Sequence, residues 1–62
     1  MKRRGKFKIA KSVDGEWFFT LTGGNGEVIL VSQMYSSEAM CAKGIRAVRL
    51  NAPLASVESG LS

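Results

Sequence analysis

Polar and apolar residues alternate along two stretches near the start of the chain. In KFKIAK (residues 6–11) charged and apolar side chains alternate, and in EWFFTLT (residues 16–22) large apolar side chains recur at every second position. A period of two is typical of a strand that packs one face on a core. The sequence therefore predicts two strands joined by a hairpin turn at Val13, Asp14 and Gly15.

The length of this hairpin loop follows from which residues share a face of the sheet. A two-residue Asp-Gly loop would pair Ile9 with Thr20. A three-residue loop, with the glycine in the left-handed position of a bulged turn, instead pairs Ile9 with Phe19. The same register pairs Phe7 with Leu21, so that one face of the hairpin is apolar throughout. We therefore predict the three-residue loop.

A second hairpin signal is the stretch TGGNGEV (residues 22–28), which separates the aromatic strand from EVILVS. Its Asn-Gly pair suits the two central positions of a type I′ turn, both of which need positive φ. This turn pairs Leu21 with Leu30 and Thr22 with Ile29. Because EVILVS is apolar on both sides, the predicted three-stranded meander needs a cover on each face.

The segment after Tyr35 predicts a helix. Ser36 or Ser37 can cap its start, Asn51 can adopt the left-handed C-terminal cap, and Pro53 prevents its continuation. Helical spacing places one set of small and apolar residues on a single face: Cys41, Gly44, Ile45 and Val48. The tail after the helix, LASVESGLS, has few apolar anchors and is either a fraying end or a short strand that needs a sheet edge.

The chain is short enough to limit its own core. Its 62 residues form one domain, and a chain of this size buries only about 60% of the surface that its unfolded form exposes. A single cysteine and no histidine remove disulfides and most metal sites as sources of extra stability. Oligomerisation remains as the expected source of additional stability.

The positive charge is concentrated at the start of the chain. The net charge is +4, and the first eleven residues contain six cations and no acid: Lys2, Arg3, Arg4, Lys6, Lys8 and Lys11. We predict a flexible basic arm over residues 1–5, a single domain over 6–58 and a flexible tail over 59–62. There is no signal-peptide pattern and no apolar run of about 20 residues. The expected location is the cytoplasm, without membrane contact and with a reduced thiol.

The order of these motifs resembles the YegP-like proteins, a family of small uncharacterised bacterial proteins. The resemblance lies in DGEWFFTL, NGEVIL, SQMYSS and KGIRAVRLNAP, and it covers roughly Phe7 to Pro53. It implies a β-β-β-α-β unit, which occurs in this family as two tandem copies or as two single-copy subunits. In both arrangements the units share one sheet and exchange their last strands. This chain has one copy and resembles the single-copy form, so the resemblance implies a homodimer. It implies no activity.

The glycine cluster is the first candidate site: Gly23, Gly24, Asn25 and Gly26. A phosphate-binding loop opens directly into a helix, whereas this cluster opens into a predicted strand and lacks the lysine and hydroxyl of a Walker loop. We therefore interpret the cluster as a hairpin turn, and Gly23 with Gly24 as a loosened approach or bulge.

The basic arm and the neighbouring aromatic residues suggest nucleic-acid binding through phosphate neutralisation and base stacking. However, Trp17 and Phe19 are needed for the core, and short basic termini are commonly only solvated. Phe18 is the one aromatic residue without an assigned role, and it is expected at a dimer contact or on an open face.

The remaining candidates favour structural roles. Cys41 lies near a helix start, which stabilises a thiolate, but no histidine can act as its base. Tyr35, Ser36 and Ser37 precede the helix as an anion site would, and helix capping explains the serines. A last set of carboxylates lies near turns, where acids are usually solvated: Asp14, Glu16 and Glu27. No catalytic, cofactor-binding or metal-binding residue is identified.

These observations predict a noncatalytic homodimer of α+β fold that acts as a binding or interaction module with an unknown ligand. The alternative is a nucleic-acid-binding accessory protein that uses the basic arm. A small enzyme would need a pocket at the dimer interface.

Overall fold

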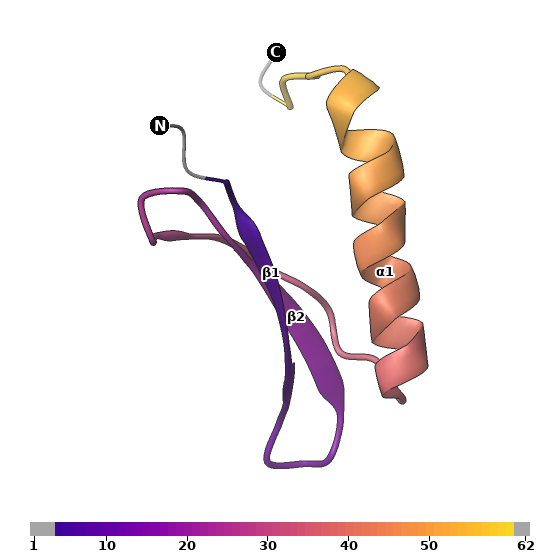
Figure 1. Ribbon diagram of the computed structural model, residues 1–62. Coiled ribbons are helices and arrows are strands. Elements are labelled where there is room, and N and C mark those ends of the chain that lie inside the picture. Colours follow the sequence, from indigo (N-terminus) through magenta and orange to yellow (C-terminus); the bar gives the residue numbers. More distant parts are fainter. Residues whose placement is uncertain (1–3, 61–62) are drawn as a thin grey trace.

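The computed structural model describes residues 4–60, in which three strands precede one helix (Figure 1). The elements are β1 (Lys6–Lys11), β2 (Trp17–Thr22), β3 (Val28–Val31), α1 (Glu38–Asn51) and the short 3-10 helix η1 (Ala52–Leu54). The strands form one antiparallel sheet in the order β1-β2-β3, and α1 packs across one of its faces. This arrangement confirms the predicted α+β class and the meander packed on one helix.

The first hairpin has the predicted register. The Ser12 N–H donates to the Glu16 carbonyl at 2.7 Å, and the Gly15 N–H donates to the Ser12 carbonyl at 3.0 Å. Gly15 has φ +86°, a left-handed conformation that glycine adopts without steric cost. Ile9 therefore pairs with Phe19, as the three-residue loop requires.

The second turn differs from the predicted type I′ turn. The Gly23 N–H donates to the Glu27 carbonyl at 2.7 Å, and the Gly26 N–H donates to the Gly23 carbonyl at 2.9 Å. Gly26 has φ +88°, while no residue other than glycine has positive φ in the described chain, so Asn25 cannot occupy a type I′ position. Both hairpins thus use the same three-residue loop, closed by a left-handed glycine.

The longer second loop changes the pairing at one position of β3. Leu21 pairs with Leu30 as predicted, but Thr22 pairs with Val28 instead of Ile29. The register shifts between Leu21 and Thr22, which leaves Ile29 as the extra residue of a β-bulge. The bulge lies at Ile29 and not at the glycines before the turn.

Helix α1 begins and faces the sheet as predicted. Ser37 is the N-cap, and its side-chain oxygen accepts a hydrogen bond from the Met40 N–H at 3.2 Å. Glu38 lies in the first turn and Arg49 in the last, where each favours the helix dipole. The least exposed residues of the helix are those of the predicted inner face, Cys41, Gly44, Ile45 and Val48.

The core lies between α1 and the sheet and is small. Only Phe19 and Cys41 are buried among the hydrophobic residues that the structure describes, at 2% and 0% exposure. Phe7 meets the Phe19 ring edge to face with centroids 5.8 Å apart, and Tyr35 stacks on it at 6.3 Å. A Cβ at Gly44 would lie 2.7 Å from Tyr35 Cζ, so only glycine allows this close approach.

The end of α1 differs from the predicted left-handed cap. Asn51 has φ −100° and ψ −32°, a right-handed conformation, and its side-chain amide donates to the Ala47 carbonyl at 2.7 Å. The backbone continues into η1, which accepts Pro53 in its first turn because the missing N–H has no partner there. The α-helix still ends before the proline.

The segment after α1 is exposed along its described length. Residues 52–60 are all exposed, and residues 55–60 form no strand, so the expected fourth strand is absent from the described chain. The sheet of the described residues contains only β1, β2 and β3, so this segment pairs with neither of its edges. The predicted arm, residues 1–5, and tail, residues 59–62, extend beyond the described residues.

Candidate functional site

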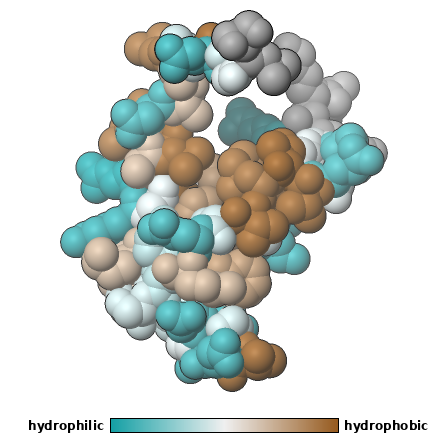
Figure 2. Space-filling model, turned by 180° about the vertical axis from the view of Figure 1, so that it is seen from behind, coloured by the Kyte–Doolittle hydropathy of each residue, from teal (hydrophilic) through white to brown (hydrophobic). Residues whose placement is uncertain are grey.

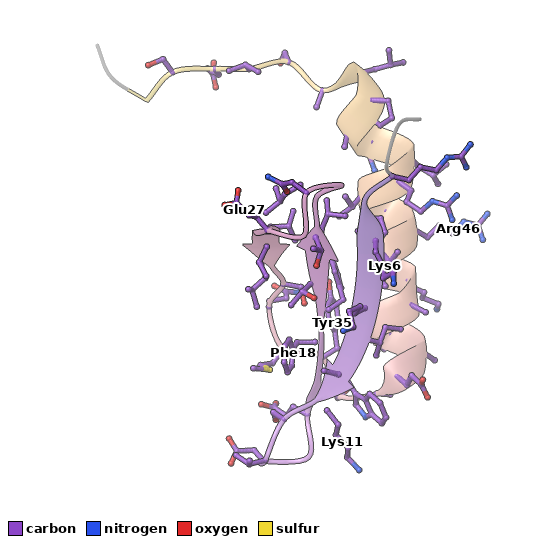
Figure 3. The ribbon with its side chains drawn as sticks, turned by 60° about the vertical axis from the view of Figure 1, so that its left-hand side comes forward. Lys6, Lys11, Phe18, Glu27, Tyr35 and Arg46 are labelled. Carbon is purple, nitrogen blue, oxygen red and sulfur yellow. The ribbon has the colours of Figure 1, made fainter. Side chains whose placement is uncertain are left out.

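The two faces of the sheet have different chemistry because successive side chains of a strand point to opposite sides. Helix α1 covers the face that contains Phe19. The other side, which we call the open face, carries Lys6 opposite Thr22 and Lys8 opposite Thr20. Figure 3 shows α1 on one side of the sheet, with Phe18 labelled on the other.

The open face contains a concave region, which we call the basic groove, with a volume of 550 Å³. It is lined by Arg4, Lys6, Lys8, Thr20, Thr22, residues 23–26 and Val28. The N-terminal segment and β1 supply the cations, and β2 supplies hydroxyl groups. The second turn supplies backbone N–H groups. No carboxylate of the described residues lines the groove. This combination of cations and hydrogen-bond donors suits an anion.

The glycine-rich turn forms one end of the basic groove. It leads into β3 and not into a helix, which confirms the prediction of a hairpin turn. Asn25 accepts from the Glu27 N–H at 3.1 Å and donates to the Glu27 carboxylate at 3.0 Å, which fixes the turn. Within the described chain the N–H groups of Gly24 and Asn25 donate no hydrogen bond, so both can donate to a ligand or water.

The three consecutive aromatic residues of β2 have separate roles. Trp17 is half-buried, and Lys11 Nζ lies 5.4 Å from the centroid of its ring, within cation–π range. Phe19 belongs to the core, as predicted. Phe18 is half-buried and pairs with Ala10 on the open face. Of the predicted stacking platforms, only Phe18 lies on the same face as the basic groove.

The predicted basic arm contributes to the groove through one described residue. Residues 1–3 lie outside the described residues, whereas Arg4 lines the groove two positions before Lys6. Arg4 thus extends the row of cations that β1 contributes to the groove.

The hydroxyl cluster before the helix has structural roles. Tyr35 pairs with Trp17 through two backbone hydrogen bonds of 2.7 and 2.8 Å, and its ring packs on the core. Ser37 caps α1, while Ser36 is exposed beside it. These contacts explain the cluster without an anion.

Cys41 is fully buried under the helix. Burial raises the pKa of its thiol above the ordinary value of 9.0, and the nearby Glu38 carboxylate raises the pKa further. A thiol with a raised pKa is a poor nucleophile near neutral pH. The environment of Cys41 is that of a core residue.

The predicted carboxylates remain separate and exposed: Asp14, Glu16 and Glu27. Glu16 belongs to the first turn through its backbone, and Glu27 is held by the side chain of Asn25. Residues 4–60 contain no group of three side chains suited to a metal ion. Neither helix in this part of the chain is long and apolar enough to cross a membrane.

The strand residues of the basic groove were not predicted as a site from the sequence. Lys6 and Lys8 were counted in the positive start of the chain, and Thr20 and Thr22 were assigned only to a strand. The signal was present in the alternation of β1, since Lys6 and Lys8 share a face. Arg4 continues the same spacing before the strand begins.

A three-stranded meander on one helix, with a basic groove on its open face, defines a small α+β domain. The chain belongs to the family described as Domain of unknown function (DUF1508), whose model matches residues 12–59. This confirms the resemblance to the YegP-like proteins. The match extends past Pro53, so most of the exposed tail lies inside the family's domain.

The relatives differ in length. A UPF0339 protein from Treponema denticola is 51% identical over 53 residues, which are 86% of this chain and 91% of that protein. The UPF0339 protein YegP from Escherichia coli (strain K12) is 47% identical over 49 residues, 79% of this chain but 44% of that protein. The chain therefore spans less than half the length of the YegP proteins it matches.

A solved structure has the same fold. The NMR solution structure of a protein from Haloferax volcanii superposes with a TM-score of 0.83 and covers 94% of this chain and 98% of that one. At 24% identity this similarity shows the fold alone.

Proposed function

We propose that the protein is a noncatalytic homodimer that acts as a cytoplasmic binding or interaction module. In this dimer the two subunits share one sheet, and each C-terminal segment adds to the sheet of its partner. The observation that carries the proposal is the amount of exposed surface. The accessible surface is 5462 Å² for a mass of 6.7 kDa, while a compact monomer of this mass has about 3900 Å².

The shape of the chain supports the same conclusion. The radius of gyration is 13.4 Å, compared with about 10.6 Å for a compact domain of this length. The excess surface, about 1500 Å², is close to the area that one subunit loses in an obligate dimer interface. Association is the simplest way to bury it.

The edge strands suggest where a partner joins the sheet. β1 has three lysines along its length, and charged edges resist pairing with other strands. β3 has no charged residue, and Val28, Ile29 and Val31 are 60%, 64% and 61% exposed. Figure 2 shows a brown hydrophobic patch on the sheet side of the molecule, viewed from behind. We infer that the partner covers the β3 edge.

The C-terminal segment is the element proposed to cover this edge. Leu54 and Val57 are 95% and 99% exposed, far more than apolar residues of a stable domain usually are. The lengths of the relatives support an assembly of two units, since the match covers nine-tenths of the Treponema denticola protein and under half of YegP. Such lengths are expected when one unit occurs singly in some chains and twice in others.

The absence of catalysis is supported by the environment of the reactive groups. The sequence contains no histidine, and Cys41 is buried with a raised pKa. A binding role needs only a surface of suitable shape and charge, which the open face provides.

Sedimentation of the full chain over low to high micromolar concentrations tests the dimer. We expect the dimer mass throughout this range, and a compact, stable monomer would contradict the proposal. Val57→Asp should raise the dissociation constant at least about tenfold, or about 1.4 kcal/mol. Val13→Asp is the matched control, because this valine is equally exposed but lies in the first turn. Equal effects of the two changes would exclude the exchanged tail.

A further inference from the structure

We propose that the basic groove binds single-stranded nucleic acid, with its cations on the phosphate backbone. This inference rests on the proposed role as a binding module but does not depend on the dimer. It differs from the alternative based on the basic arm, because the lysines and threonines of the groove belong to β1 and β2, and the predicted arm adds only Arg4.

The positive charges form a row along the groove. Arg4, Lys6 and Lys8 all line the groove and are spaced by two residues. In an extended chain the first and last of them are about 13 Å apart. Side chains of a strand stand roughly perpendicular to the sheet, so the row matches successive phosphates of a chain better than one phosphate group. The spacing therefore favours an extended anion over a single free phosphate.

Hydrogen-bond donors lie beside this row of cations. Thr22 lies opposite Lys6 and Thr20 opposite Lys8, so a hydroxyl group accompanies each lysine. The N–H groups of Gly24 and Asn25 stand at the end of the groove and are unused within the described chain. Hydroxyl and backbone N–H groups are common partners of phosphate oxygens.

No carboxylate of the described residues neutralises the cations within the groove. The nearest carboxylate in the second turn belongs to Glu27, which does not line the groove and is hydrogen-bonded to Asn25 at 3.0 Å. Figure 3 labels Glu27 at the end of the sheet, away from the side chain of Lys6. The lysines thus lack a neighbouring acid in the groove to neutralise them.

An aromatic side chain on the same face favours a single strand over a duplex. Phe18 is the neighbour of Thr20 on this face of β2, and it lies opposite Ala10 on β1, where the row of cations ends. Unpaired bases can stack on an aromatic ring, whereas a duplex keeps its base faces inside the helix. A phosphate backbone on cations with bases on aromatic side chains is the usual pattern of single-strand binding.

The test is a binding titration of the full chain with a fluorescent single-stranded thymidine oligonucleotide at several salt concentrations. Three phosphate contacts predict that the logarithm of affinity falls with the logarithm of salt concentration with a slope of about −2. The double variant Lys6→Gln with Lys8→Gln should reduce this slope to about −0.7 and greatly weaken binding at low salt. Because both lysines are exposed, circular dichroism should show an unchanged fold.

The matched control is Lys43→Gln with Arg46→Gln, which removes the same charge from exposed positions of α1. It should leave the slope unchanged. Equal losses of affinity in the two double variants would overturn the proposal. A lack of binding at low salt, or tighter binding of a duplex than of the single strand, would also overturn it. If binding is lost only in the double variant Lys2→Gln with Arg3→Gln, the basic arm and not the groove is the binding site. Sedimentation reports the dimer separately, so failure of the groove and failure of the dimer can be distinguished.

Discussion

Phe19 and Thr20 are neighbours on β2, yet they lie on opposite faces of the sheet and in different environments. Phe19 is 2% exposed between the rings of Phe7 and Tyr35, while Thr20 lines the basic groove beside Lys8. The covered face determines whether the chain folds, because it holds the only buried apolar side chains of the described residues. The open face contributes little to the core and is therefore available for binding.

The largest expected loss of stability is at Gly44, where α1 packs on the covered face of the sheet. A Cβ there would meet Tyr35, and the larger leucine side chain would push α1 from the sheet. Overpacking costs about 1–3 kcal/mol or more, against a total stability of about 3–9 kcal/mol for this length. We expect Gly44→Leu to lower the melting temperature strongly or to prevent folding. Ala47→Leu, at an exposed position of α1, should melt like the parent chain.

A smaller loss of stability is expected when neighbouring residues on the two faces of β2 are changed. Leu21→Ala removes a half-buried side chain from the covered face and should cost about 1–2 kcal/mol, less than at a fully buried site. Thr20→Val keeps the branched shape on the open face and should change stability by less than about 0.5 kcal/mol. Urea unfolding of the two variants measures the difference. Similar losses would show that the open face is also part of the core.

The smallest effect concerns the buried thiol and appears only at alkaline pH. Because the folded chain raises the pKa of Cys41, the unfolded chain releases this proton first as the pH rises through about 9. The thiol therefore favours the folded state below that pH, and this contribution decreases above it. Relative to Cys41→Ala, the parent chain should lose stability between neutral and alkaline pH. Rapid reaction of the folded thiol with a disulfide reagent at neutral pH would contradict its burial.

Much of the fold followed from the alternation of residues. The pairing of Ile9 with Phe19 required only that the apolar side chains share a face, and the inner face of α1 followed from helical spacing. Both depend on the burial of large side chains, which leaves a clear pattern in a sequence.

The second turn was harder to predict, because two loops satisfy the same hydrophobic pairing. Leu21 faces Leu30 with either a two-residue or a three-residue loop, since the bulge at Ile29 accommodates the additional residue. The Asn-Gly pair favoured the shorter loop, but the preceding glycines allowed the longer one. The basic groove was missed for another reason: its lysines and threonines are ordinary in exposed strands, and only their common face indicates a site.

The two matching turns have a consequence for how the chain reaches its native state. Each hairpin is closed by contacts between residues four apart, and such hairpins form within about 1–10 μs. Since β2 belongs to both, either hairpin can form first and then offer β2 as a template for the remaining strand. The sheet is thus expected to have two alternative early folding routes. A substitution that slows the formation of one hairpin still allows folding to begin at the other. The helix, which depends on the aromatic residues of the finished meander, is expected to dock last.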